Sequence, residues 1–556
     1  MSDNLRFNVA DQRLAYTGEK KEFSFNESRI IEFNHRHLTS LANYDLQLKR
    51  CNIVTLADKI NNKSNLGALR NRQLRQSVIL SAAFSAIAVG LHGRGAYNNY
   101  SEAEQTKDLA NQLKRANDRT AAQIMAEVLQ TTTEKLPLGE DVIIESAITE
   151  GARMKPGKEA GGNPTIAVGA VYGKPEHCAQ YGLNMPKNVS LLSMGNDVID
   201  GTTKSIKGLH SSFTALFVTE SNIKRHLPDI YVQRWMSGTY FEKFNPRDIS
   251  STDAAEIIAQ SYKMKNVNEL SAFFLDRPRH IPAMDELNKA GVSTPFDKDG
   301  DLMPGLLMGL EGLKFPDGKG LHSMIGEIGG SAEWAVGVLP LVWRGGQALG
   351  MLTSQSSLTQ KGFSPDELWK ERFHFTEEEF LQIQDARFER KPYFTIEDIL
   401  EKPFAGGISA FGAITDNYYL PFIKGVTADF EKNEVNVDVL TINSLGVVQV
   451  WHFTFMGKSN LKDSVNKMTS PKEKLEKLQG ADLEREIGKF IDGETTNRQY
   501  QLFFNNEYYP ALIPVRHQMY VLHQAVDGLI ERGALQPIDK EIIAITEKLA
   551  PEWFAS

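Results

Sequence analysis

The order of hydrophobic and polar positions predicts helices that alternate with strands through the middle of the chain. Residues 73–92 have an apolar face, and residues 102–130 contain strong helix formers without Gly or Pro, so both segments predict helices. The apolar runs "EDVIIESAI", "VSLLSMGNDVIDGTT" and "SSFTALFVTE" predict three strands after them. Further helices are predicted at 281–292 and 331–343. This alternation favours a layered α/β or α+β core.

The two ends of the chain follow other patterns. Residues 1–70 are polar and irregular, with short strand-like runs and a predicted helix near 54–66. The β-branched residues at 434–456 predict a hairpin around "NSLG". From residue 458 onward, charged residues with helical character predict a mostly helical appendage.

Composition and charge narrow the class of protein. The 556 residues are 41% hydrophobic, which is enough for a large core, and the formal net charge of -8 does not favour a nucleic-acid partner. Two cysteines, Cys51 and Cys178, are too few for a disulfide framework or a thiolate zinc site. The apolar stretch 77–93 is short and rich in Ser and Ala, so it predicts a buried helix, and the N-terminus has no apolar signal region. We therefore expect a cytoplasmic protein without membrane contact.

The stretch "GNDVIDGTTKSIKG" at 195–208 is the strongest candidate for chemistry. Asp197 ends a predicted strand, Asp200 follows three residues later, and Gly201 permits a tight turn. Carboxylates are the ligands that Mg²⁺ and Mn²⁺ prefer, and the hydroxyl of Thr202 could orient an attacking water. From spacing alone, an Asx turn capped by the threonine is an equally good interpretation.

Several motifs resemble one enzyme family. "DVIDGTT" resembles the D-P-I-D-G-T-T signature of the lithium-sensitive, metal-dependent phosphatases, with Val198 in place of proline. Six further blocks occur in the same order as in the class II, GlpX-type fructose-1,6-bisphosphatases, and the resemblance covers roughly residues 73–457. The blocks are "EDVIIESAITEGARMKPGKEAG", "LPDIYVQRWMSG", "DRPRHIPAMDELNKAGV", "DKDGDLMPGLL", "IGEIGGSAEWAVG" and "ISAFGAIT".

The resemblance implies a fold and an activity. The expected fold is a layered α-β-α-β-α sandwich of the sugar-phosphatase type. The expected reaction is hydrolysis of the 1-phosphate of a sugar bisphosphate, with fructose 1,6-bisphosphate as the first candidate and Mg²⁺ or Mn²⁺ as cofactor, in gluconeogenesis or a related pathway. Sedoheptulose 1,7-bisphosphate or an inositol phosphate is the alternative substrate. Family members are commonly dimers or tetramers, which implies a homo-oligomer here.

The resemblance also assigns residues, position by position. The implied metal ligands are Glu145, Asp197, Asp200 and Glu333, with the carbonyl of Ile199 as an extra ligand. Thr202 would position the attacking water, and Asp197 and Glu145 would share the catalytic role. The residues implied for the sugar phosphate are Gly201, Thr202, Tyr231, Arg277, Arg279, Asp299, Gly300 and Asp301.

The sequence departs from the family where the chemistry lies. The family has a metal-binding Asp where this chain has Ala96, and an alternative alignment assigns that role to Asp118. Two further family acids are replaced by Ala147 and Thr149, and Trp334 replaces a glycine. Each lost carboxylate weakens the attraction for divalent cations. A catalytically inactive phosphatase-fold protein with a binding, structural or regulatory role is therefore the second hypothesis.

The resemblance also divides the chain. The expected parts are an N-terminal extension, a first phosphatase-like half with the metal site, a second half with an insertion near 345–400, and a C-terminal appendage that could bind a protein partner. Their bounds are 1–72, 73–270, 271–457 and 458–556.

Overall fold

The computed structural model describes most of the chain between residues 5 and 469. The gaps within that range are 12–13, 58–70, 138, 151–164, 167–169, 175–176, 178–187, 225–230 and 354–390. The acidic loop beyond Glu150, most of the expected insertion and most of the expected C-terminal appendage therefore lie outside the described residues.

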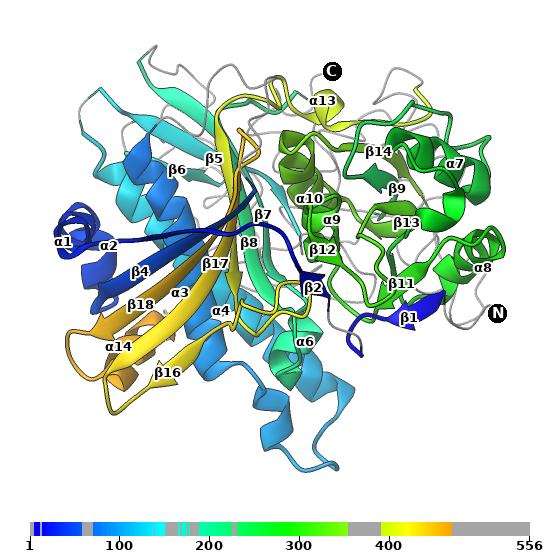
Figure 1. Cartoon of the computed structure of the whole chain (residues 1–556). Coiled ribbons are helices and arrows are strands. Elements are labelled where there is room, and N and C mark those ends of the chain that lie inside the picture. Colours follow the sequence, from blue (N-terminus) through cyan, green and yellow to red (C-terminus); the bar gives the residue numbers. More distant parts are fainter. Residues whose placement is uncertain are drawn as a thin grey trace, which may run out of the picture.

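A ten-stranded sheet forms the first half of the structure (Figure 1). Neighbouring strands in it are antiparallel except β5 and β7, which run parallel. Their order is β3 (Lys21–Ser24), β4 (Leu46–Ala57), β18 (Val448–Gly457), β17 (Glu434–Asn443), β15 (Gly407–Ala413), β8 (Phe213–Thr219), β7 (Ser190–Asp200), β5 (Val142–Thr149) and β6 (Val171–Tyr172), and β16 (Thr427–Asp429) pairs with β17.

Two long helices cover one face of this sheet, α3 (Arg72–His92) and α4 (Lys107–Glu134). The side chain of Asn71 accepts a hydrogen bond from the Leu74 N–H and so caps the start of α3. The segment Arg72–Asn99 is long and apolar enough to cross a membrane, but 89% of its most apolar window is buried inside the protein. The packing of α3 between the sheet and α4 accounts for its composition.

The second half adds three more layers. The strands β13 (Ser323–Gly330), β9 (Tyr231–Ser237) and β14 (Gln347–Leu352) form a smaller sheet. Helix α10 (Ser331–Trp343) contacts both sheets and packs beside α9 (Leu302–Leu307), while α7 (Ser251–Ser261) lies against the outer face next to α8 (Ile281–Lys289). The expected α-β-α-β-α layering is confirmed.

The N-terminal residues join both halves. Strand β1 (Arg6–Asn8) lies parallel to β11 (Thr294–Asp297), which also pairs with β10 (Phe274–Leu275). Strand β2 (Ala15–Tyr16) pairs with β12 (Leu313–Lys314), whereas β3 and β4 extend the large sheet. The remaining N-terminal helices are α1 (Glu27–Arg36) and α2 (Leu38–Asn43).

Most elements predicted from the sequence are confirmed. The helices expected at 73–92, 102–130, 281–292 and 331–343 correspond to α3, α4, α8 and α10, and the expected hairpin is β17–β18. The helix predicted near 54–66 is wrong for 54–57, which continue β4. Those residues alternate within a paired strand, and the pairing with β18 overrides their local pattern.

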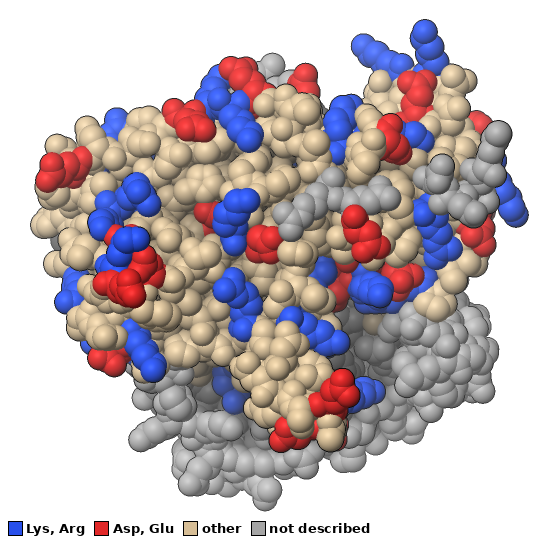
Figure 2. All heavy atoms as spheres, turned by 60° about the horizontal axis from the view of Figure 1, so that its bottom comes forward, with Lys and Arg blue, Asp and Glu red and all other residues tan. Residues whose placement is uncertain are grey.

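Short elements complete the described chain. They are η1 (Ala96–Asn99), α6 (Thr202–Lys207), η2 (Val267–Glu269), η3 (Pro278–His280), α13 (Ile396–Ile399) and α14 (Leu461–Thr469). Helix α14, the described part of the expected appendage, packs against α3, α4 and β18. On the face shown in Figure 2, acidic and basic side chains are interspersed over the described surface.

Candidate functional site

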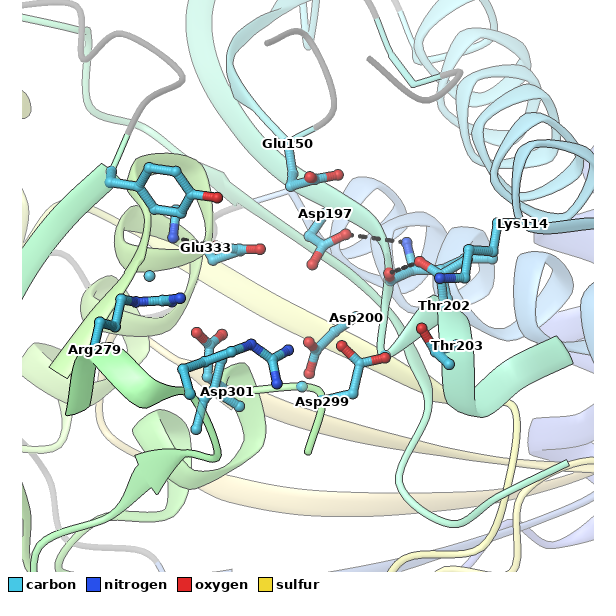
Figure 3. A pocket seen from close by; sticks show the side chains of 18 residues that line it. Lys114, Glu150, Asp197, Asp200, Thr202, Thr203, Arg279, Asp299, Asp301 and Glu333 are labelled. Atoms are coloured by element: carbon cyan, nitrogen blue, oxygen red, sulfur yellow. Dashed lines mark hydrogen bonds between the residues drawn. The ribbon is translucent and has the colours of Figure 1, made fainter. Parts of the chain in front are cut away.

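One cavity of about 240 Å³ lies between the two halves and collects nearly all the residues that the sequence indicated (Figure 3). Of the thirteen predicted positions, only Glu145 is missing from its lining. The lining residues are Lys114, Glu150, Asp197, Ile199, Asp200, Gly201, Thr202, Thr203, Tyr231, Leu275, Arg277, Arg279, Asp299, Gly300, Asp301, Gly329, Gly330 and Glu333.

Strand β7 carries both Asp197 and Asp200. The sequence predicts that this strand ends at Asp197, and that prediction is wrong. The strand continues to Asp200, and Gly201, with φ of 75°, makes the turn into α6. Asp197 pairs with Ala215 of β8 and Asp200 with Phe213, so the register shifts by one residue between the two acids. Residues three apart on a regular strand point to opposite faces. The extra residue is what lets both carboxylates face one cavity.

Glu150, which directly follows β5, lines the cavity, whereas Glu145 within β5 does not. Thr149 pairs with Asn196, and the backbone N–H of the next residue, Glu150, donates to the Asn196 carbonyl, so Glu150 lies beside Asp197. Glu145 is level with Ser193, four residues before Asp197, which is roughly 13 Å along a strand. The structure thus places Glu150 where the resemblance had implied Glu145.

Helix α4 adds a cation and an acid. Lys114 lines the cavity, and Asp118 lies one helical turn further along. Asp118 is 2% exposed and is one of the carboxylates that raise the pKa of Asp197, so the two acids are neighbours. Ala96, the other position left open by the sequence, starts η1 and does not line the cavity.

Glu333 faces the cavity from the first turn of α10. The backbone N–H of Gly330 donates to the Glu333 carboxylate, which fixes the side chain at the start of its own helix. The next residue, Trp334, is fully buried and packs edge-on against Phe394, with ring centroids 4.9 Å apart. The replacement of the family's glycine by Trp334 therefore fills the core behind the site and leaves the cavity open.

The other two acid replacements form a neutral buried cluster. The Thr149 hydroxyl oxygen lies 2.8 Å from that of Thr165, and it donates to the Asn196 side chain at 3.0 Å. Ala147 is fully buried. These positions contribute hydrogen bonds and packing beside the site, but no charge.

Repulsion among carboxylates dominates the electrostatics around Asp197. Burial raises its pKa well above the usual range, and so do the charges of Glu150, Asp200, Glu333 and Asp118. Figure 3 shows Glu150, Asp197 and Glu333 directed toward the same space. Among the described residues, no three His, Cys, Asp or Glu side chains lie close enough together to coordinate one metal ion as they stand. The donor set nevertheless suits a hard divalent cation, because buried carboxylates that repel one another need positive charge.

The opposite wall carries two arginines that follow β10. Arg277 donates through Nη1 to the carbonyls of Asp276 and Lys298, at 2.9 and 2.7 Å. Arg279 donates to the Ile328 carbonyl, but its Nη1 is buried without a hydrogen-bond acceptor among the described residues. Burial lowers the pKa of this guanidinium. A buried donor that points into a cavity is suited to an anionic ligand.

His280 has a structural role next to these arginines. Its Nδ1 donates to the Leu275 carbonyl at 2.7 Å, and its Nε2 accepts from the Ile328 N–H at 2.9 Å. Burial and the nearby arginines lower the pKa of His280 to about 3. The neutral ring therefore fixes the turn that presents Arg277 and Arg279.

The loop after β11 closes the floor of the cavity. Gly300 has φ of 78°, and a Cβ atom there would lie 3.2 Å from the Asp200 carboxylate, so a larger residue would be strained and would crowd that carboxylate. The Oδ2 atom of Asp299 is buried without a hydrogen-bond donor among the described residues. Burial and Asp301 raise the pKa of Asp200, whereas Lys204 lowers it.

Two buried cations hold this loop. Arg234 is 2% exposed and bonds both Asp301 and Glu327. Burial alone would lower the pKa of Arg234, but the two carboxylates more than offset that effect and raise it. Lys204 donates to Asp297 at 2.6 Å and to the Tyr418 hydroxyl at 2.9 Å.

Comparison with known proteins identifies the family. A family model described as bacterial fructose-1,6-bisphosphatase, glpX-encoded, matches residues 101–449, which is more than half of the chain. The chain belongs to this family. The GlpX-type resemblance inferred from the sequence motifs is therefore confirmed.

Curated relatives carry the same family name. A protein of Synechococcus sp. (strain JA-3-3Ab) named D-fructose 1,6-bisphosphatase class 2/sedoheptulose 1,7-bisphosphatase is 24% identical over 249 residues, which cover 45% of this chain and 66% of that protein. A protein of the same name from Trichodesmium erythraeum (strain IMS101) is 24% identical over 30% of this chain and 46% of its own length. The chain thus spans slightly less than two thirds of the first of these relatives.

Lys114 and Glu150 line the cavity but were not predicted as site residues, although the sequence carries a signal for each. Glu150 lies two residues after the strand predicted at "EDVIIESAI", and the carboxyl ends of parallel strands meet at the edge of a sheet where ligands bind. Lys114 lies one turn before Asp118 on a predicted helix, so the two share a face. If Asp118 is taken as the metal-binding acid, Lys114 is expected close to the metal site, because the two residues are four apart on one helix.

Proposed function

We propose that this GlpX-family protein hydrolyses the 1-phosphate of a sugar bisphosphate, with fructose 1,6-bisphosphate as the first candidate and sedoheptulose 1,7-bisphosphate as the second. The observation that supports this most is the pairing of two unlike walls in one cavity. One wall carries repelling buried carboxylates, and the other carries an arginine with a buried, unused N–H donor.

The carboxylate wall suits Mg²⁺ or Mn²⁺. The side chains that would hold the cation are Asp118, Glu150, Asp197, Asp200 and Glu333, with the Ile199 carbonyl as a further oxygen. A bound divalent cation would polarise the phosphate and lower the pKa of a bound water. In this proposal Glu150, just after β5, replaces Glu145 as the ligand from this part of the chain.

The chain's own side chains would bind and orient the substrate. The Thr202 hydroxyl donates to the Ile199 carbonyl at 3.2 Å, so its oxygen is fixed beside the acids and can accept a hydrogen bond from the attacking water. The unused Nη1 of Arg279 would bind a phosphate oxygen, and Lys114 would approach it from the opposite side. Asp299 would accept a hydrogen bond from a sugar hydroxyl.

The position of Tyr231 supports a sugar-phosphate ligand. Tyr231 pairs with Gly330 at the start of β9, and the Arg279 guanidinium lies 5.6 Å from the centre of its ring. This contact restrains the arginine in the orientation that faces the cavity. A reaction in cytoplasmic carbohydrate metabolism, such as gluconeogenesis, would fit the substrate.

The test is phosphate release from fructose 1,6-bisphosphate and sedoheptulose 1,7-bisphosphate, with Mg²⁺ or Mn²⁺, by matched variants. Glu150→Gln should lower kcat/KM about 30- to 100-fold and raise the metal concentration for half-maximal rate, because it removes a charged ligand. Glu145→Gln is the same change five residues earlier, within β5, and should stay within about threefold of the wild type.

Two results would contradict the proposal. Equal losses in the two variants would mean that Glu150 has no special place in the site. Absence of turnover by the wild type with both metals and both substrates would favour the catalytically inactive binding protein. Direct titration of the wild type with fructose 1,6-bisphosphate would then measure whether the cavity still binds it.

A further inference from the structure

We propose that the described N-terminal residues 5–11 and Leu14 (the N-terminal segment) are a positioning element for the substrate-binding wall of the cavity. The proposal rests on the function proposed above, since it assigns the segment an effect on substrate binding. The segment precedes residues 101–449, which match the family model.

The strands that lead into the substrate-binding wall share one small sheet with the N-terminus. Strand β10 leads directly to Arg277 and Arg279, and β11 leads directly to the Asp299–Asp301 loop. Strand β1 is the third strand of this parallel sheet, in the order β1-β11-β10. The carboxyl ends of parallel strands form the edge where ligands bind, so the position of β11 sets the position of the loop.

Strand β1 supplies much of the pairing that holds β11. Its three residues pair with residues 294–296, whereas β10 pairs with β11 only at Phe296 and Asp297. Two hydrogen bonds bracket the contact: the Thr294 N–H donates to the Leu5 carbonyl at 2.6 Å, and the Val9 N–H donates to the Phe296 carbonyl at 2.9 Å. The second bond lies one residue before Asp297, at the base of the loop.

Side chains fix β1 against the second half. Val9 is fully buried, and Phe7 packs edge-on against Phe315 with ring centroids 5.3 Å apart. The Arg6 guanidinium lies 5.6 Å from the centre of the Phe296 ring. These contacts attach β1 to Phe296 of β11 and to Phe315, and so help to hold the two strands in register.

The segment also contacts the base of the Asp299–Asp301 loop indirectly, through Tyr418 and Lys204. The Leu14 N–H donates to the Tyr418 carbonyl at 3.0 Å, and Leu14 is 1% exposed. The Tyr418 hydroxyl accepts from Lys204, which also binds Asp297. The segment thus contacts β11 through its backbone and also the residue that helps to hold Lys204 against Asp297.

The positions of these contacts predict a selective effect. Loosening the segment would move the loop and the arginines. The proposed metal ligands belong to other elements: Asp118 to α4, Asp197 and Asp200 to β7, and Glu333 to α10, while Glu150 follows β5. The loop and the arginines are proposed to bind the substrate rather than the reacting water, so a partial loosening should weaken substrate binding severalfold and leave kcat nearly unchanged. Metal affinity should be spared.

The test compares two phenylalanine truncations in the N-terminal strands of the full-length protein. Phe7→Ala removes the contact with Phe315, and Phe23→Ala is the matched control because Phe23 lies on β3 and is 43% exposed. Phe7→Ala should raise KM about five- to tenfold, with kcat and the half-maximal metal concentration within about twofold of the wild type. Phe23→Ala should leave all three unchanged.

A second measurement does not depend on activity. Hydrogen–deuterium exchange of the same variants should become faster at residues 294–301 in Phe7→Ala, with β7 unchanged. An unchanged KM, or an equal increase in exchange over β7 and β11, would overturn the positioning role. If the wild type hydrolyses no substrate, the proposed function fails, and the exchange pattern still decides whether the segment holds the loop.

Discussion

Two groups of carboxylates meet at one cavity, and their surroundings differ. Asp301 and Asp297 each bond a buried cation, Arg234 and Lys204 respectively. Asp197, on the facing strand, has four carboxylates as the charged neighbours that most affect its pKa. A buried carboxylate with a cation is part of the framework, whereas a buried group of like charges is unstable until a cation arrives. The difference separates acids that shape the site from acids that would bind metal.

The arginines show the same division. Arg234 is enclosed by Asp301 and Glu327, so its charge is already matched within the protein. Arg279 bonds only a backbone carbonyl and keeps a buried N–H donor without an acceptor among the described residues. Arg234 therefore stabilises the framework, and Arg279 is available to a ligand.

The largest expected effect comes from removing the central acid. Asp197→Asn should lower phosphatase activity on the order of a thousandfold, because it removes a charge from the metal-binding wall. The same change should raise the melting temperature without metal. Burial raises the pKa of Asp197, so the folded state opposes its ionisation, and this penalty grows as the pH rises above the usual carboxyl range.

Thermal melts with and without Mn²⁺ check this prediction. The wild type should gain about 2.7 kcal/mol of stability at a metal concentration one hundred times the dissociation constant, and Asp197→Asn should gain much less. A lower metal-free melting temperature in the variant would contradict the view that these acids repel one another.

The next largest effect is expected for Arg234, which stabilises the framework through Asp301 and Glu327. Arg234→Met should lower the free energy of unfolding by about 3 to 5 kcal/mol, since it leaves Asp301 and Glu327 buried without their cation. Urea denaturation measures the change. Arg36→Met is the matched control, because Arg36 is 41% exposed, pairs with Glu32 on one helix face, and should shift stability by less than about 1 kcal/mol. Equal shifts would remove the distinction between the two kinds of arginine.

The smallest effect is expected for Arg279, the arginine whose buried N–H donor is proposed to bind a ligand. Arg279→Lys should raise KM for fructose 1,6-bisphosphate about tenfold, because an ammonium cannot reproduce the planar fork of the guanidinium. Its free energy of unfolding should stay within about 1 kcal/mol of the wild type. Steady-state kinetics beside urea denaturation measures both, and a large loss of stability with unchanged KM would place Arg279 in the framework instead.

The sequence alone determined the elements and the family. The apolar pattern predicted α3, α4, β5, β7, β8 and the β17–β18 hairpin, because long periodic segments fold largely as their local pattern indicates. The "DVIDGTT" turn and the ordered blocks indicated a GlpX-type phosphatase, and the family model agrees. Most of the candidate site followed from these motifs, since twelve of thirteen predicted positions line one cavity.

Only the tertiary structure decided which acids face one another. A shift of register in β7 brings Asp197 and Asp200 to one face, and the level of β5 against β7 selects Glu150 over Glu145. The position of α4 brings Asp118 and Lys114 to the site. Strand register and helix placement depend on contacts between residues far apart in the chain, so no local pattern encodes them. The same holds for the N-terminal strand beside β11, whose three residues carry no signal of their partner.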